Sequence, residues 1–180
     1  MLSISGEPST GSVSQIDFKS YARTNGVGYT LVKWKHHCIV GVLYYALYGN
    51  TNCQATIGSG TNSYTKNTGL TNSLGMNDSS ASATGNSGSI NFLGLENWWG
   101  NKYEFIDNAT FNHGGTDYKF YIVEDDGSSR EVQAHQYTGT FYPTVMVFGE
   151  HLDLVMKPNT TSGTTSTGFC DSQYFLGNSN

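Results

Sequence analysis

The feature that most constrains the fold is an apolar run from Cys38 to Tyr48, followed by Gly49 and Asn50. The run is apolar nearly all round a helix, and a glycine after the last apolar residue is a typical helix stop. The β-branched centre would also suit a strand, but the length of the run and the glycine favour a helix. We therefore expect a helix over residues 32–48 that lies in the interior and is covered on most sides.

A second, shorter helix is expected near the N-terminus. Ser14 can cap a helix that ends near Arg23, because Asn25 and Gly26 follow it as a stop. Residues 59–89 are dominated by Gly, Ser, Thr and Asn, which predicts a long surface loop.

The second half of the chain predicts short antiparallel strands. Residues 118–123 and 130–135 alternate in polarity and flank an Asp-Asp-Gly turn at 125–127, which is a hairpin signal. Further strands are expected over residues 103–109, 144–148 and 152–156, with another starting within 169–176. Two early helices and later strands define an α+β fold, with a flexible segment over 1–12 and one domain over 13–180.

Charge and composition exclude some partners. The net charge is −5, and only 13% of the residues are charged, so no basic face is available for nucleic acid or for an anionic membrane. No apolar run approaches the ~20 residues that a membrane span needs, and we expect no membrane insertion.

The three cysteines show no metal-ligand spacing. Cys38 lies in the apolar run and is interpreted as a small buried hydrophobic residue. A disulfide between Cys53 and Cys170 stays open, because sequence alone cannot establish it.

Several segments, taken in order, resemble one family. The pattern comprises an aromatic residue such as Trp98, then Gly-Asn-x-Tyr-Glu at 100–104, Phe-Gly-Glu-His-Leu-Asp-Leu at 148–154 and Phe-Cys-Asp-x-x-Tyr at 169–174. It is similar to domains of the formylglycine-generating-enzyme-like subfamily, which has the C-type-lectin-like fold. Closer similarity is to tail or surface domains of gut phages and Bacteroidetes, some of them variable proteins of diversity-generating retroelements.

The resemblance implies a C-type-lectin-like fold with two helices, short antiparallel strands and long loops. In the family, further strands follow the Cys-Asp-x-x-Tyr segment and complete the sheet. This chain stops at Asn180, so we expect the domain to lack its C-terminal strands, or a partner strand to complete it.

Enzymatic chemistry is not predicted. The resembling enzymes need a pair of cysteines near the C-terminus, and Cys170 is single there. Calcium-dependent sugar motifs are absent, and the histidines show no zinc spacing, so we expect no metal and no cofactor. Glu150 and Asp153 could line a structural cation site, but a hydrogen-bonding role in a turn is favoured. Glu104 is expected to be structural.

The function expected from this resemblance is ligand or receptor binding without catalysis. Tyr and small polar side chains suit adaptable recognition. Ligand-binding residues are predicted at Trp98, Trp99, Tyr174, Asn178 and Asn180, with one of the two tryptophans in the core. Structural roles are predicted for Gly100, Asn101, Glu104, Gly149 and Glu150.

The resemblance also sets the expected partner and location. The partner would be a protein or glycan on a host-cell surface, and the protein would lie in a virion, as part of a phage tail, or on a cell surface. A homo-oligomer stays open. The alternative function is a structural module of a virion or surface assembly, which holds neighbours together without binding a receptor.

Overall fold

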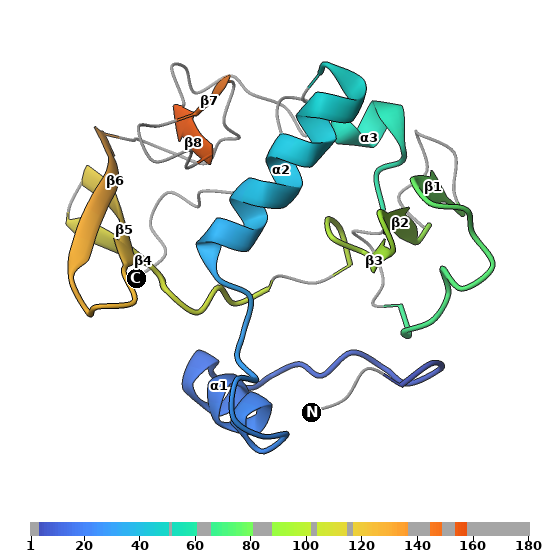
Figure 1. Cartoon of the computed structure of the whole chain (residues 1–180), viewed down its shortest axis with the longest axis horizontal. Coiled ribbons are helices and arrows are strands. Elements are labelled where there is room, and N and C mark those ends of the chain that lie inside the picture. The colour runs from blue at the N-terminus through green and yellow to red at the C-terminus, as the bar shows by residue number, and fades with distance from the viewer. Residues whose placement is uncertain are drawn as a thin grey trace. The chain divides into compact units, whose positions relative to one another are not determined.

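The computed structural model describes residues 4–50, 52–60, 66–80, 88–101, 104–114, 117–136, 145–148 and 154–157. Within these ranges the chain combines helices with small antiparallel sheets, which confirms the α+β class (Figure 1). Contacts divide the chain into two compact units that interleave along the sequence. Unit 1 comprises 1–31 and 53–105, and unit 2 comprises 32–52 and 106–180.

Helix α1 of unit 1 (Gln15–Arg23) begins where the sequence predicts it. The hydroxyl oxygen of Ser14 accepts a hydrogen bond from the Asp17 amide at 3.2 Å, and the same hydroxyl donates to the Asp17 carboxylate at 2.7 Å. The cap therefore satisfies one of the amides that a helix N-terminus leaves without an intrahelical partner.

The other elements of unit 1 are short. They are α3 (Cys53–Thr56) and a three-stranded antiparallel sheet of β1 (Asp78–Ser79), β2 (Ile90–Phe92) and β3 (Leu95–Glu96), in the order β1-β2-β3. A two-residue turn joins β2 to β3 with positive φ at both residues, 52° at Leu93 and 82° at Gly94. This geometry belongs to the type I′ turn, whose twist suits a tight hairpin.

The core of unit 1 forms around this sheet. Ile90 and Phe92 of β2 are fully buried, and Cys53 of α3 is 1% exposed. The side chain of Asn91, between the two buried residues, accepts a hydrogen bond from the Gly94 amide at 2.9 Å. The alternation buries one face of β2 and leaves the other for turn hydrogen bonds.

The N-terminal segment is paired with a distant part of unit 1. Pro8 forms an isolated antiparallel bridge with Asn67. The Gly6 amide donates to the Thr68 carbonyl at 2.8 Å, and the Thr68 amide donates to the Glu7 carbonyl at 2.9 Å. Residues 6–8, which lie within the segment expected to be flexible, therefore form a short ladder in this structure.

Unit 2 contains the long helix that the apolar run predicts. Helix α2 spans Trp34–Tyr48, and Gly49 ends it in the left-handed conformation with φ 63° (Figure 1). Within the part of the chain that the structure describes, one side of the helix is covered and the other is exposed, so the expected burial on most sides is not seen there. Trp34, Cys38 and Tyr44 are buried, but residues 35, 36, 39, 42, 43, 46 and 47 are all exposed.

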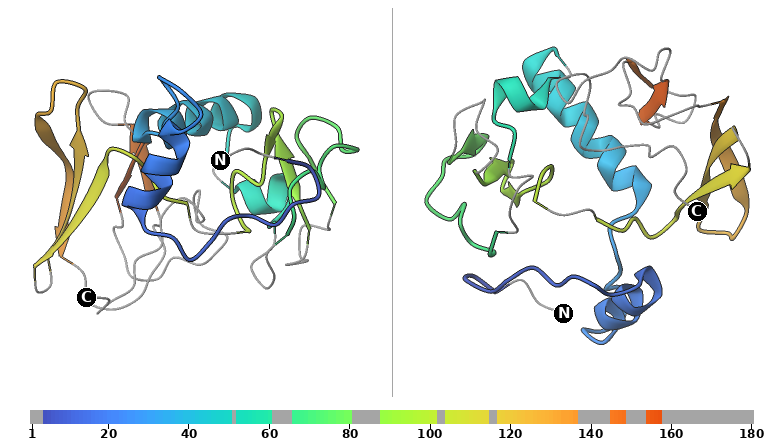
Figure 2. Two further views of the ribbon diagram at one scale, coloured as in Figure 1. Left: turned by 90° about the horizontal axis from the view of Figure 1, so that it is seen from below. Right: turned by 180° about the vertical axis from the view of Figure 1, so that it is seen from behind.

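The strands of unit 2 form two antiparallel groups. β4 (Ala109–Gly114), β5 (Asp117–Val123) and β6 (Ser129–Gln136) make one sheet, and β7 (Val145–Phe148) pairs with β8 (Leu154–Lys157). The predicted hairpin at 125–127 is confirmed and joins β5 to β6, as the strands in Figure 2 show. α2 and β6 both contact β8.

One predicted strand is wrong. Residues 104–108 are not in a strand, and β4 begins only at Ala109. The strand expected to start within 169–176 lies outside the described residues.

Candidate functional site

The residues with the strongest sequence signal lie in a tight turn of unit 1, Glu96–Asn101, which we call the 96–101 turn. Three of its residues have positive φ: Asn97 at 52°, Gly100 at 77° and Asn101 at 68°. Glycine and asparagine adopt this left-handed region at lower cost than other residues. The Gly-Asn pair of the sequence motif therefore has a local backbone reason to be there.

Side chains of the 96–101 turn hold loops that are distant in sequence. The Asn101 side-chain oxygen accepts a hydrogen bond from the Lys66 amide at 2.9 Å, and its amide nitrogen donates to Ser9 Oγ at 3.4 Å. Glu96 Oε2 accepts from the Gly69 amide at 2.8 Å. Glu96 Oε1 is buried and has no hydrogen-bond partner among the described residues. The turn thus contacts both segments of the ladder between residues 6–8 and 67–68, which we call the N-terminal ladder.

Trp99 is the tryptophan that lies in the core. Its side chain is 4% exposed, its ring centroid lies 5.7 Å from that of Phe92, and its indole N–H donates to the Gly58 carbonyl at 2.8 Å. Gly60 has φ 68°, and a Cβ there would lie 3.1 Å from the Trp99 carbonyl oxygen. Only glycine fits this approach without strain.

Trp98 is half-buried and lies in a bend. Exposed residues within and just after the 66–69 segment, which the 96–101 turn contacts, include Asn67, Leu70, Asn72 and Met76. Polar amides and large apolar side chains on a held loop are suitable for ligand contacts, because a rigid scaffold lowers the entropy lost on binding.

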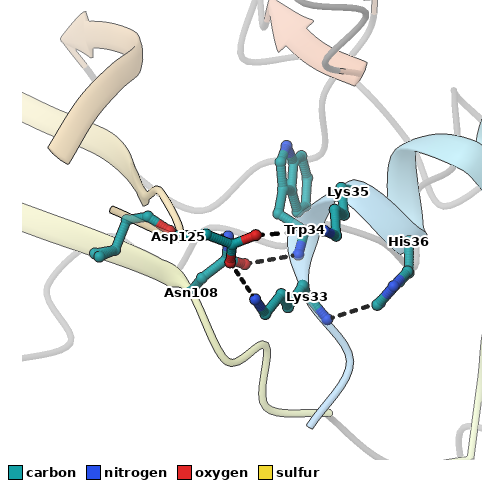
Figure 3. Close-up of polar contacts among 7 residues, drawn as sticks. Lys33, Trp34, Lys35, His36, Asn108 and Asp125 are labelled. Atoms are coloured by element: carbon teal, nitrogen blue, oxygen red, sulfur yellow. Dashed lines mark hydrogen bonds and ion pairs between the residues drawn. The ribbon is translucent and has the colours of Figure 1, made fainter. Parts of the chain in front are cut away.

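A second polar cluster lies in unit 2, where α2 begins beside the β5–β6 hairpin (Figure 3). Lys33 Nζ donates to and forms an ion pair with Asp125, and Lys35 Nζ lies 3.7 Å from the same carboxylate. Asn108 accepts from the Trp34 amide at 2.8 Å and donates to the Val123 carbonyl at 3.1 Å. This cluster is a helix start tied to a hairpin, and it leaves no evident ligand position among the described side chains.

The ion pair has the expected electrostatic effect. The hydrogen bond from Lys33, followed by its charge, lowers the pKa of Asp125, and the bond to Asp125 raises the pKa of Lys33. Both groups are on the surface, where such pairs contribute little stability.

One histidine of α2 is strongly perturbed. Burial, followed by the charge of neighbouring His36, lowers the pKa of His37 to about 4. The His37 ring stacks on Trp34 with centroids 6.1 Å apart, whereas His36 is exposed and its Nδ1 accepts from the Lys33 amide at 3.1 Å. The two rings therefore have different surroundings and do not form a shared metal site.

The remaining predicted residues fall into two groups. Glu104 is exposed as a residue, yet burial of its carboxyl group raises the pKa of that group to about 7. Gly149, Glu150, Tyr174, Asn178 and Asn180, together with Asp153 and Cys170, lie outside the described residues. The structure therefore places only Trp98, Trp99, Gly100 and Asn101 in one turn.

Sequence reasoning missed two residues of that turn, Glu96 and Asn97, and the glycines that it contacts. Asn97, which accepts from the Ile90 amide at 3.0 Å, and Glu96 gave no motif of their own. Gly58 and Gly60 lie at the edge of a segment that composition marks only as loop. The available signal was the density of Asn and Gly around Trp98 and Trp99, since these residues favour left-handed turns.

The chain was compared with known proteins at three levels. No protein-family model, no curated protein and no solved structure matches it. Within the described part of the chain, no three His, Cys, Asp or Glu side chains gather as a metal site. No described helix is long and apolar enough to cross a membrane.

Proposed function

We propose that the chain is a non-catalytic domain that binds a ligand or receptor, with the C-type-lectin-like fold, displayed on a phage tail or a bacterial surface. The observation that carries the proposal is the 96–101 turn, whose side chains hold the 6–8 and 66–69 segments at fixed positions. Loops fixed on a rigid turn are a common way to present binding residues.

The chemistry of the presented surface supports recognition by contact area and hydrogen bonds. The 66–69 segment held by the turn offers Asn67 as a hydrogen-bonding group, and the residues after it offer Asn72 as another and Leu70 and Met76 as exposed apolar groups. Trp98 adds a half-buried aromatic at the same turn. A host-cell protein or a glycan fits this mixture, because aromatic and amide side chains serve both.

The experiment is a cell-binding assay with the labelled full-length chain. Trp98→Ala is expected to weaken binding about tenfold or more, as for an aromatic hot spot. Tyr21→Ala, which removes an exposed aromatic from α1, is the matched control and should bind as the parent does. Protease or periodate treatment of the cells distinguishes a protein receptor from a glycan.

Two outcomes would contradict the proposal. If no cell type or isolated surface component binds the chain, the alternative of a structural assembly module gains support. It gains further support if Trp98→Ala blocks incorporation into particles while cell attachment by the assembled particles is unchanged.

A further inference from the structure

Residues 4–9 lie against the 66–72 segment of unit 1 much as an added strand lies against the edge of a sheet. The main chains of the two segments form the N-terminal ladder. In addition, Asn67 Nδ2 donates to the Gly6 carbonyl at 2.8 Å, and the Thr68 hydroxyl donates to a further carbonyl of the N-terminal segment. Bonds to main-chain atoms are the way in which proteins bind extended peptides by strand addition.

Gly69 shapes the 66–72 segment for this partner. Its φ is 85°, and a Cβ there would lie 2.0 Å from Ser5 Oγ and 3.1 Å from Ser5 Cα. Only glycine permits so close an approach with this backbone conformation. Asn72 Nδ2 also donates to Ser5 Oγ at 3.3 Å. The 66–72 segment therefore matches residues 4–9 in shape as well as in hydrogen bonding.

The connection between the N-terminal ladder and α1 is short and strained. It comprises residues 10–14, of which 10–12 are exposed. Ser12 has φ 58°, in the left-handed region that residues other than glycine adopt at a cost. Short hinge loops under strain promote exchange of a terminal segment between copies, because the hinge relaxes when the segment binds to a second molecule.

We propose that two copies of the chain exchange residues 4–9, so that this segment of each copy binds to the 66–72 segment of the other. Each copy keeps the hydrogen bonds of its N-terminal ladder, and Ser12 leaves the left-handed conformation. The ladder within one chain competes with exchange, since a short tether gives an effective concentration on the order of millimolar. This inference goes beyond the proposed binding function and does not depend on it.

Disulfide trapping between two full-length variants tests the exchange. Ser5→Cys and Asn72→Cys are mixed at about 1 mM each and then oxidised, in a background with Cys170→Ser, while the two other cysteines are buried. We expect a covalent dimer with one copy of each variant, because residues 5 and 72 are in contact.

A mixture of Ser5→Cys with Met76→Cys is the matched control for random collision. Met76 is 71% exposed and lies in the same unit, so its thiol would be fully accessible. We expect about tenfold less covalent dimer from this mixture than from the mixture with Asn72→Cys. Equal yields from the two mixtures would overturn the proposal.

Substitutions at Ser12 test the role of the hinge, in the same pair of cysteine variants. Ser12→Gly removes the strain from the closed monomer and should lower the yield of covalent dimer about fivefold. Ser12→Pro fixes φ near about −65°, which excludes the closed hinge, and should raise the yield. Unchanged yields in both hinge variants would show that the copies do not exchange their N-terminal segments through this hinge, and would overturn the proposal.

Discussion

Asn101 combines a left-handed backbone with two side-chain hydrogen bonds, to Lys66 and Ser9. Asn101→Ala loses both bonds and must still adopt φ near 68°, so we expect a loss of about 2–3 kcal/mol in the free energy of unfolding. Asn101→Gly loses the bonds but not the backbone fit, and should cost about 1 kcal/mol less. Urea unfolding followed by tryptophan fluorescence measures both. Equal losses in the two variants would show that the left-handed conformation carries no cost at this position.

His37 links stability to pH. Its pKa is about 4 in the folded chain and about 6.5 when unfolded, so between these values the unfolded state binds more protons. Acidification therefore destabilises the fold. The contribution of His37 to the free energy of unfolding should fall by about 2 kcal/mol from pH 7 to pH 5. His37→Gln should remove that part of the pH dependence in urea unfolding, while His36→Gln should retain it. An unchanged pH profile in His37→Gln would exclude this histidine as the cause.

At the scale of elements, the end of α2 depends on Gly49. Its φ of 63° lies in the left-handed region, and its amide donates to the Tyr45 carbonyl at 2.8 Å. A Cβ at this position would meet no atom within 4 Å, so a substitution isolates the backbone cost. Gly49→Ala is expected to destabilise the fold by about 1 kcal/mol, and Gly49→Asn by less. Thermal unfolding followed by circular dichroism distinguishes the two variants. Equal unfolding temperatures would show that the left-handed conformation at residue 49 does not decide the cost of a substitution.

Elements with a local cause could be predicted from the sequence. Ser14 as a cap, Gly49 as a stop and the Asp-Asp-Gly turn at 125–127 each act on residues close to them in sequence, and α1, α2 and the β5–β6 hairpin follow. The β2–β3 hairpin was missed because Leu93 occupies a left-handed position that its residue type disfavours. There, the Leu93 amide donates to the Asn77 side chain and the Gly94 amide donates to the Asn91 side chain. The bond to Asn77 joins residues 16 apart in sequence, so it is tertiary.

Features that depend on neighbours could not be predicted. The composition of α2 predicted burial on most sides, but burial depends on which segments cover each face, and only one face is covered among the described residues. The 96–101 turn was recognised by its Gly-Asn pair, whereas its partners Gly58, Lys66 and Gly69 lie in loops without periodicity. The backbone of the candidate site is therefore a local property that the sequence predicts, whereas the contacts of its side chains are tertiary and could not be predicted.

At the scale of the whole molecule, the N-terminal ladder should protect the amide of Thr68 from exchange with solvent. Removal of residues 1–9 deletes the Glu7 carbonyl that accepts from the Thr68 amide and the Ser9 hydroxyl that contacts Asn101. The Thr68 amide should then exchange with solvent about tenfold faster or more. The Asn97 amide, which donates to the Ile90 carbonyl at 2.8 Å, is the control within the same unit and should keep its protection. Unchanged exchange at Thr68 would show that the ladder does not stabilise the 66–68 segment.

The interleaving of the two units has a consequence for biosynthesis. Residues 1–31 of unit 1 leave the ribosome before residues 53–105, which they need to complete their unit. At about 5–20 residues per second, the 74 residues from 32 to 105 take roughly 4 to 15 seconds to make. During that interval α2 has been synthesised, whereas the hairpin strands that belong to its unit have not. The nascent chain therefore exposes its most apolar helix before either unit can close, and a chaperone that shields this helix on the ribosome should raise the yield of folded protein.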